Sequence, residues 1–370
     1  MAAGSTARSQ VRILSPQDVP GAAALFARIR PEFRWSSRHA SEAYFHQILF
    51  ENPWRHLDVP SWVAEEDGRL CGLYVVLPRP MLFRGHAIRA AIGCQFLVDP
   101  AARDRLTALR LAQACLSGSQ DLTLADAANE RARRMLLGLG GCAPPLLSLH
   151  WTRILRAGRH ALALCEERRT LPPRIARVMR PLGTLVDALV GRASGDRSWR
   201  AIGRTVDAQI DATEMLDHLH GGADPRALQP VYDRVSLGWL LEQSSLKTRH
   251  GNLRARGVRD DAGGLIGWYL YYLRPGALGE VIHISASPAA YPTVLKHLLA
   301  DAWHAGATAL RGRVDPRFAQ EMSDCRCWFR WEGAWTLAHS RDSAIVAAIQ
   351  SGDACLSRLA GEWWLRFAGG

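Results

Sequence analysis

Residues 96–116 read FLVDPAARDRLTALRLAQACL, a run that predicts a strand, a short basic turn and then a helix. The first turn of such a helix carries backbone N–H groups without helical partners, and the positive end of the helix dipole lies there. This terminus can bind phosphate oxygens, and Arg103 and Arg105 can add charge-assisted hydrogen bonds to a pyrophosphate. The alternative for the same residues is an ordinary strand-to-helix turn whose arginines face solvent.

The segments on either side of this run predict an α+β fold. Before it, strands of mixed or alternating apolarity lie at 61–65, 69–77 and 86–98. The turn signal EDG separates the first two, and the segment from PRP to RG separates the last two. After it, helix and strand alternate from 105 to 151. Antiparallel hairpins that lead into alternating strands and helices are typical of a mixed sheet with helices on its faces.

The second half of the chain repeats this plan. WVAEEDGRLCGLYVVLPR at 62–79 aligns with GVRDDAGGLIGWYLYYLR at 257–274. The matched residues are Gly68, Leu70, Gly72 and Tyr74 in the first half and Gly263, Leu265, Gly267 and Tyr269 in the second. One architecture used twice therefore explains the chain better than one large sheet, and we expect units at 1–152 and 205–370.

The net charge gathers between these units. The chain has 46 basic and 35 acidic residues, an excess of +11, and only Lys247 and Lys296 among the basic residues are lysines. Residues 153–204 hold 12 arginines against four acids, which is most of that excess. The pattern predicts a basic helical connector that packs between domains, with a membrane-surface or nucleic-acid element as the alternative. Because the charge lies outside both units, we do not expect nucleic acid as a partner.

Composition excludes several classes of protein. With 48% apolar and 22% charged residues, the chain is neither a disordered tail nor a fibre. No run reaches the roughly 18 to 20 apolar residues that cross a bilayer, and the start lacks the apolar core of a signal peptide, so we expect a cytoplasmic protein. The eight cysteines form no CxxC pair, so we expect reduced structural thiols and no metal, with a metal or redox role for Cys325 and Cys327 as the alternative.

The quoted run resembles the fourth strand and pyrophosphate loop of the GNAT acyltransferases. In that loop signature, Arg103 matches the first position and Ala108 the last, whereas Leu106 stands where the family has a glycine. The following segment, DLTLADAANERARRMLLGLGG, is similar to the family's fifth strand and next helix. Asn129 matches the start of that helix, and Leu136 stands where many members have the tyrosine that protonates the leaving thiolate.

This resemblance implies two tandem GNAT-like mixed-sheet domains joined by the basic connector, the second one degenerate. It also implies that acetyl-CoA or another acyl-CoA is the co-substrate. The residues expected to contact it are Leu97, Val98, Arg103, Asp104, Arg105, Leu106, Thr107, Ala108 and Asn129. The oxyanion would be held by a backbone N–H of the fourth strand. The candidates for the base are Asp126, Glu130 and His150, each with a purely structural role as its alternative.

The implied function is an N-acyltransferase that acts on a small amine or amino sugar, similar to members of bacterial polysaccharide pathways. Two alternatives stay open. One is an aminoacyl-tRNA-dependent transferase of similar two-domain build, which the basic middle segment favours. The other is a non-catalytic acyl-CoA-binding or scaffold protein, which Leu106 and Leu136 favour. The sequence does not indicate an oligomeric state.

Overall fold

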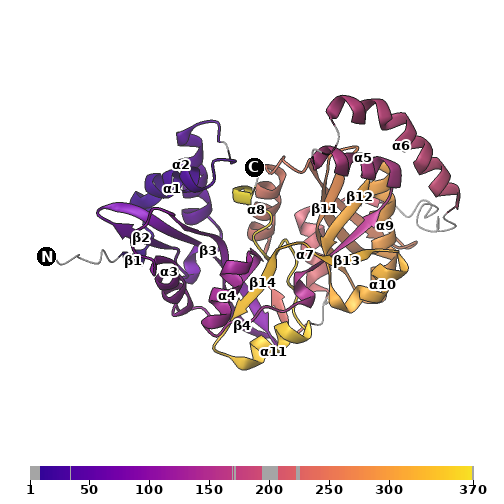
Figure 1. Cartoon of the computed structure of the whole chain (residues 1–370). Coiled ribbons are helices and arrows are strands. Elements are labelled where there is room, and N and C mark those ends of the chain that lie inside the picture. The colour runs from indigo at the N-terminus through magenta and orange to yellow at the C-terminus, as the bar shows by residue number, and fades with distance from the viewer. Residues whose placement is uncertain are drawn as a thin grey trace.

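The computed structural model describes residues 9–33, 35–168, 170, 172–193, 207–221 and 226–368. Two mixed sheets of seven strands each lie side by side and are surrounded by helices (Figure 1). Sheet A has the order β1 (Gln10–Ile13), β2 (Trp62–Glu66), β3 (Arg69–Phe83), β4 (His86–Val98), β5 (Leu122–Ala128) and β14 (Trp335–His339), and β8 (Leu228–Pro230) pairs with β3. Sheet B has the order β13 (Trp328–Trp331), β6 (Leu149–Ile154), β12 (Ala309–Arg313), β11 (Leu278–Ala286), β10 (Leu265–Leu273), β9 (Asn252–Arg259) and β7 (Asp207–Gln209).

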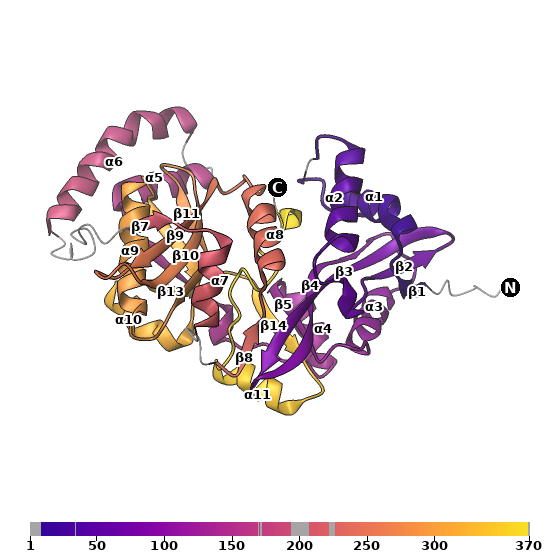
Figure 2. The same ribbon diagram turned by 180° about the vertical axis from the view of Figure 1, so that it is seen from behind.

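The helices cover these sheets, as the opposite view also shows (Figure 2). Those of the first half are α1 (Val19–Ile29), α2 (Arg38–Phe50), α3 (Thr107–Leu116) and α4 (Glu130–Gly138). Those that follow are α5 (Ala157–Glu167), α6 (Pro173–Ala193), α7 (Ala212–His220), α8 (Arg234–Ser245), α9 (Tyr291–His304), α10 (Ala319–Asp324) and α11 (Ser343–Ser351). Side-chain caps begin several of them, as Asp211 does for α7 and Asp233 for α8. The predicted α+β class with two mixed sheets is confirmed.

One local prediction was wrong, because the PRP segment is strand and not turn. β3 continues through Pro78 and Pro80, and the turn lies at Arg84 and Gly85. Proline donates no backbone hydrogen bond, so it fits a strand where one neighbour is missing. On that side of β3, pairing with β2 ends at Tyr74 and pairing with β8 begins only at Met81.

The two sheets exchange their last strands. β6 follows the first-half helix α4 but pairs with β12 and β13 of sheet B. β14 follows the second-half strand β13 but pairs with β5 of sheet A. Sheet membership therefore does not divide the chain at residue 152, and the division into units at 1–152 and 205–370 stays a prediction.

The repeat found in the sequence appears in the geometry of both sheets. The hairpin turns of β2–β3 and β9–β10 each contain a glycine with positive φ, Gly68 at +74° and Gly263 at +84°. The central strands β4 and β11 each carry a β-bulge against the preceding strand, with Cys94 and Ile282 as the extra residues. Both halves thus keep the same irregularity at the same place.

The C-terminal segment, residues 353–368, packs between the two halves (Figures 1 and 2). Phe367 is 1% exposed, and its ring centroid lies 4.9 Å from that of Tyr44 and 4.8 Å from that of Phe45, both in α2. Trp364 is fully buried and meets Trp239 of α8 edge-on at 5.2 Å. The tail therefore joins α2 to α8 through aromatic contacts.

The basic connector predicted at 153–204 is only partly within the described chain. Residues 169, 171 and 194–204 lie outside the described residues, and the described part contains the end of β6 and the helices α5 and α6. α6 lies at the outer edge of the molecule beyond α5 and not between the sheets (Figures 1 and 2). Among the described residues, no helix is both long and apolar enough to span a membrane.

Phe367→Ala should lower the free energy of unfolding by about 3 to 5 kcal/mol, because it leaves a cavity among three aromatic rings of α1 and α2. Urea unfolding followed by circular dichroism measures this change. Trp328→Ala is the matched control, since Trp328 is 71% exposed and its truncation should change stability by about 0.5 kcal/mol or less. Equal losses in both variants would show that the tail does not hold the halves together.

Candidate active site

The centre of sheet A opens where β4 and β5 stop pairing. These parallel strands pair at Ala90–Leu122, Ala91–Thr123 and Ile92–Leu124, and no further pair follows. The bulge at Cys94 lies directly beyond the last pair and leaves an extra residue outside the ladder. We call the region between residues 93–98 and 125–128 splay A. A cavity of about 20 Å³ lies at the β5 side of this region, lined by Asp126 and by the tail residue Gly361.

Sheet B opens at the equivalent place. β11 and β12 pair last at Glu280–Arg311, and the bulge at Ile282 follows. We call the region between residues 281–286 and 312–313 splay B. It holds a cavity of about 60 Å³ that Arg313, Arg358 and Trp151 help to line.

Asp126 and Arg313 hold corresponding positions in the two sheets and contact each other. Each lies two residues beyond the last pair of its parallel ladder. The Arg313 Nη2 donates to the backbone oxygen of Asp126 at 2.6 Å and lies 3.7 Å from its Oδ2. The two splays therefore meet at a buried contact between opposite charges.

The tail adds a second carboxyl group at this contact. The backbone N–H of Glu362 donates to Asp126 Oδ1 at 3.2 Å. A Cβ at Gly361 would lie 2.1 Å from Asp126 Oδ2, so only glycine allows this approach. Burial and the charge of Asp126 raise the pKa of Glu362 well above its usual value. Splay A therefore has two carboxyl groups, one on β5 and one on the tail.

Splay B is bounded by a second ion-pair network. Arg358 of the tail donates to Glu280 at 2.7 Å, and Arg311 also pairs with Glu280. Burial alone would raise the pKa of Glu280, but Arg358 and Arg311 hold it at about 2. Glu280 is therefore a charged anchor for the tail and not a proton acceptor near neutral pH.

His150 lies beside this network, because it is directly opposite Arg313 in the β6–β12 pairing. The ring is 5% exposed, and its Nδ1 has no hydrogen-bond partner among the described residues. Burial and the charges of Arg358 and Arg313 lower the pKa of His150 to about 3. Of the three candidate bases, the structure thus brings Asp126 and His150 together on either side of Arg313.

The third candidate, Glu130, begins α4 and is bound by its own helix. Its carboxylate pairs with Arg133 at 2.8 Å and Arg134 at 3.0 Å, and these hydrogen bonds lower the pKa of Glu130 to about 2. Asn129 caps the same helix, since its side chain accepts from the N–H of Ala132 at 2.9 Å. Both contacts are structural.

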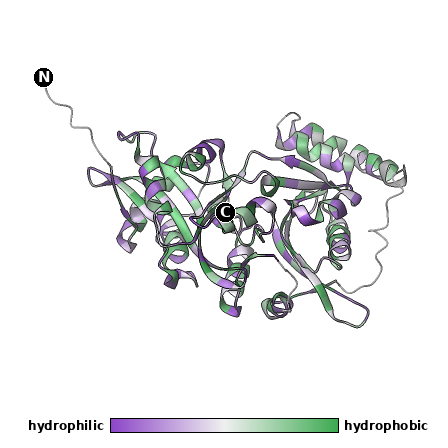
Figure 3. Ribbon diagram, turned by 90° about the horizontal axis from the view of Figure 1, so that it is seen from below, coloured by the Kyte–Doolittle hydropathy of each residue, from purple (hydrophilic) through white to green (hydrophobic). Residues whose placement is uncertain are grey.

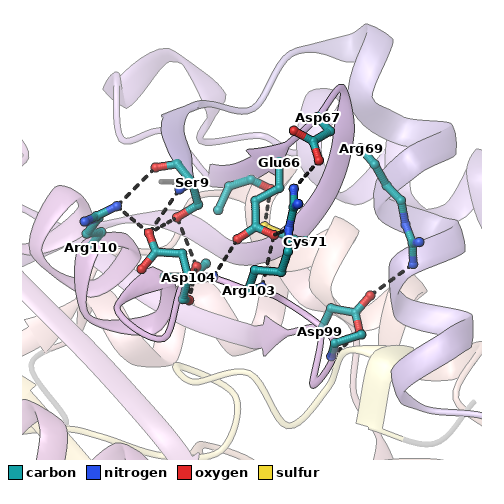
Figure 4. A network of polar contacts seen from close by, with 12 residues as sticks. Ser9, Glu66, Asp67, Arg69, Cys71, Asp99, Arg103, Asp104 and Arg110 are labelled. Atoms are coloured by element: carbon teal, nitrogen blue, oxygen red, sulfur yellow. Dashed lines mark hydrogen bonds and ion pairs between the residues drawn. The ribbon is translucent and has the colours of Figure 1, made fainter. Parts of the chain in front are cut away.

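The predicted pyrophosphate loop already holds a carboxylate (Figure 4). The backbone N–H groups of Arg103 and Asp104 donate to the two oxygens of Glu66 at 3.1 and 3.0 Å. The Arg103 side chain pairs with Asp67 of the same hairpin. Glu66 therefore occupies the backbone donors that a phosphate would use at these two residues, and a pyrophosphate would have to displace it.

The rest of the loop divides into buried and exposed residues. Asp104 accepts from Ser9 at 2.9 Å and pairs with Arg110, while Thr107 is fully buried and donates to Ser9 at 2.9 Å (Figure 4). Arg105 and Leu106 are exposed, Ala108 is half-buried in the first turn of α3, Leu97 is buried in the core and Val98 is half-buried. Arg105 is thus the basic side chain of the loop best placed to meet a ligand.

Sequence reasoning missed Tyr74 as a candidate acid. A Cβ at Gly93 would lie 2.6 Å from the Tyr74 hydroxyl, so this oxygen rests against β4 directly before the bulge. Tyr74 packs on the face of sheet A with Cys115 of α3. Burial raises its pKa well above the usual value, so it carries a proton. The sequence repeat aligns Tyr74 with Tyr269, but it gives neither tyrosine a role in chemistry.

Lys247 was also missed, although it is one of two lysines. It is 1% exposed, and its ammonium donates to the carbonyl oxygens of Trp363 and Leu365 and lies 4.2 Å from the centroid of the Trp363 ring. Burial lowers the pKa of Lys247 from 10.5 to about 7. Within the described residues, no cluster of His, Cys, Asp and Glu is large enough to hold a metal ion.

The chain resembles several solved acyltransferase structures. A GCN5-related N-acetyltransferase from Kribbella flavida superposes with a TM-score of 0.58 at 10% identity, over 92% of this chain and 73% of that one. A conserved protein from Enterococcus faecalis V583, described as a probable N-acyltransferase, gives 0.58 at 10% identity over 90% and 73%. Saccharomyces cerevisiae N-myristoyltransferase with bound myristoyl-CoA and inhibitors gives 0.51 at 11% identity over 91% and 80%.

These likenesses show a GNAT-like fold, and the fold part of the sequence resemblance is thereby confirmed. No model of a known protein family matches the chain, and no curated protein matches its sequence.

The stability of the wild type should rise more steeply with pH than that of Lys247→Met. Between pH 7 and about 10, the unfolded state binds the Lys247 proton and the folded state does not, so folding gains up to about 1.4 kcal/mol per pH unit. Urea unfolding at pH 7, 8 and 9 measures the difference in slope. Lys296→Met, which removes the other lysine, should keep the wild-type slope. If stability rises with pH equally in Lys247→Met and in the wild type, the lowered pKa of Lys247 is refuted.

Proposed function

We propose that the protein is an acyl-CoA-dependent N-acyltransferase with two GNAT-like domains in tandem, and that the reaction takes place in splay A. The observation that carries this proposal is the bulge at Cys94 beside two buried carboxyl groups, Asp126 and Glu362. The bulge leaves Cys94 as an extra residue in the β3–β4 register, and its backbone N–H would be the oxyanion donor. The carboxylate of Asp126 would be the proton acceptor. An acyl-CoA donor also agrees with the cytoplasmic location expected from the sequence.

The donor would approach splay A from the face that carries α3. Leu97 and Val98 on β4 would line the pantetheine arm. Arg105 and the first turn of α3 near Ala108 would contact the pyrophosphate, because both are accessible and positively polarised. The contact of Glu66 with the loop N–H groups opposes this binding, and the pyrophosphate would replace that carboxylate.

The transfer would proceed by direct attack of a neutral amine on the thioester carbonyl carbon. The new C–N bond moves an electron pair to the carbonyl oxygen, which would accept a hydrogen bond from the backbone N–H of Cys94 at the bulge. Asp126 takes the proton from the attacking nitrogen. Collapse of the intermediate breaks the C–S bond, and the Tyr74 hydroxyl, in place of the tyrosine absent at Leu136, gives its proton to the leaving thiolate.

The acceptor is proposed to be a small amine, with an amino sugar of a polysaccharide pathway as the case that the sequence resemblance favours. A second candidate function is a non-catalytic scaffold. The contact of Glu66 with the phosphate-binding N–H groups favours it, since an anion is already in that place.

Arg105→Ala and Glu66→Gln should change acetyl-CoA binding in opposite directions. Loss of Arg105 removes a charge-assisted hydrogen bond and should raise the Kd about tenfold, whereas Glu66→Gln removes a competing anion and should lower the Kd. Isothermal titration calorimetry measures both constants. Arg89→Gln, at the far end of β4, is the control. Absence of any acyl-CoA binding in the wild type would favour the scaffold.

Tyr74→Phe should lower kcat for acetyl transfer at least tenfold and leave the Kd for acetyl-CoA unchanged, because only the departing thiolate uses the hydroxyl. Single-turnover acetylation of a panel of amines and amino sugars measures the rate. Tyr269→Phe changes the corresponding tyrosine of sheet B and is the matched control. If Tyr269→Phe abolishes transfer and Tyr74→Phe does not, the reaction belongs to sheet B.

A further inference from the structure

The contact between the two splays contains buried polar atoms that nothing in the described chain satisfies. The Nε and Nη1 of Arg313, the Nε of Arg358 and the Nδ1 of His150 are buried without a hydrogen-bond partner. The Arg313 side chain is only 7% exposed. Unsatisfied buried donors of a charged group are costly, so native proteins usually pair them with a ligand, an ion or water.

The two arginines of this group lie at a cavity that can hold a ligand. Arg313 lines both the cavity of about 60 Å³ in splay B and the one of about 20 Å³ in splay A. One water needs roughly 10 to 15 Å³ by this measure, so the larger cavity accommodates a group of several atoms. Its walls combine apolar side chains, such as Trp151 and Val281, with the charged side chains of Arg226, Arg358 and Asp315. Arg313 thus adds a positive charge to a small space of mixed polarity.

We propose that this cavity binds a carboxylate through Arg313, and that the carboxylate belongs to the amine acceptor, which is then an amino acid or a similar carboxylate-bearing amine. The assignment to the acceptor rests on the proposed function, whereas the binding itself does not. Arg313 contacts Asp126, the proposed proton acceptor, so a carboxylate on Arg313 holds the acceptor amine next to splay A.

The surroundings favour a carboxylate over a phosphate. The carboxylates of Asp126 and Glu280 lie in the same cluster and repel a doubly charged group. The carboxylate of Asp315 also lines the cavity and adds to this repulsion. A planar, singly charged carboxylate fits the guanidinium group better.

The test uses the full chain and isothermal titration with the N-acetyl derivatives of the protein amino acids, which are the products of the proposed reaction. The uncharged N-acetyl amino acid amides are the matched controls. At least one acid should bind, and its amide should bind at least tenfold more weakly. Arg313→Gln should weaken the acid at least tenfold and leave the acetyl-CoA Kd unchanged, since a charge-assisted hydrogen bond has that magnitude.

Arg313→Lys keeps a positive charge beside Asp126 and should fold even where Arg313→Gln does not, and circular dichroism checks both. Arg89→Gln should bind the acid like the wild type. Binding of acetyl-CoA without binding of any acid overturns this inference and leaves the proposed function standing. Binding of an acid through Arg313 without acetyl-CoA binding supports the carboxylate site and overturns the proposed function. Tighter binding of inorganic phosphate than of every acid overturns the choice of carboxylate.

A second, independent observation concerns α6. Ile175, Val178, Leu182, Leu185, Val186 and Leu189 on this helix are each between 43% and 78% exposed. At the spacing of an α-helix they form one stripe, visible as green along α6 in Figure 3. The helix is attached to α5 by another side, where Asp187 accepts from the N–H of Gly158 at 2.7 Å and pairs with Arg159 at 2.8 Å. The apolar stripe is therefore open to a partner.

The charge of the helix indicates which partner covers the stripe. The α6 sequence contains four arginines and one acid, and the exposed Arg174 lies at its start. A long helix with an apolar stripe and a basic remainder is typical of a segment that lies on an anionic bilayer. We infer that α6 binds the surface of membranes that contain anionic lipid and holds the enzyme there without spanning the bilayer.

Co-sedimentation with vesicles of phosphatidylcholine, with and without phosphatidylglycerol, tests this inference. The wild type should sediment at least tenfold more with the anionic vesicles, and Leu185→Glu should remove the difference. Val235→Glu is the matched control, because Val235 is 71% exposed on α8. Equal binding to both vesicles overturns the inference, and so does a dimer in solution that Leu185→Glu dissociates.

Discussion

The exchange of β6 and β14 is the constraint on which the rest of the structure depends. Each sheet is completed by a strand that the chain delivers from the other half, so neither sheet is whole without the other. The exchange also fixes where the chain goes after β14. From there, α11 and the tail return between the halves, and Phe367 and Trp364 join α2 to α8.

The charged contact between the splays follows from this exchange. The two sheets lie side by side, and in each the parallel ladder ends two residues before the contact, where sheet A carries Asp126 and sheet B carries Arg313. Burying opposite charges costs solvation free energy, which their attraction only partly returns. Such a contact is a poor means of raising stability. It does keep charged groups in a dry place where they act strongly on a ligand.

Local patterns in the sequence predicted most elements, because apolar periodicity, Asx caps and Gly turns act over a few residues. The strand predicted at 146–151 was found in this way and lies at Leu149–Ile154, but its partners in sheet B were not predicted. Pairing of β6 with β12 joins residues that are about 160 positions apart, and nothing in either strand encodes that choice. The same limit applies to the site. Asp126 was found from its strand, whereas Glu362 and Arg313 become relevant only when the tail and sheet B meet splay A.

The loop at 99–106 shows how one motif can have two uses. A helix N-terminus with basic residues attracts anions, and the sequence alone does not say whether the anion is a ligand or a side chain. In this chain the carboxylates of Glu66 and Asp104 are the anions that accept from the loop N–H groups. Leu106 stands in place of a glycine that would let a ligand approach the backbone. Arg105 stays exposed. A donor that binds here must therefore gain more from Arg105 and the α3 terminus than it loses by displacing Glu66, and this balance decides between an enzyme and a scaffold.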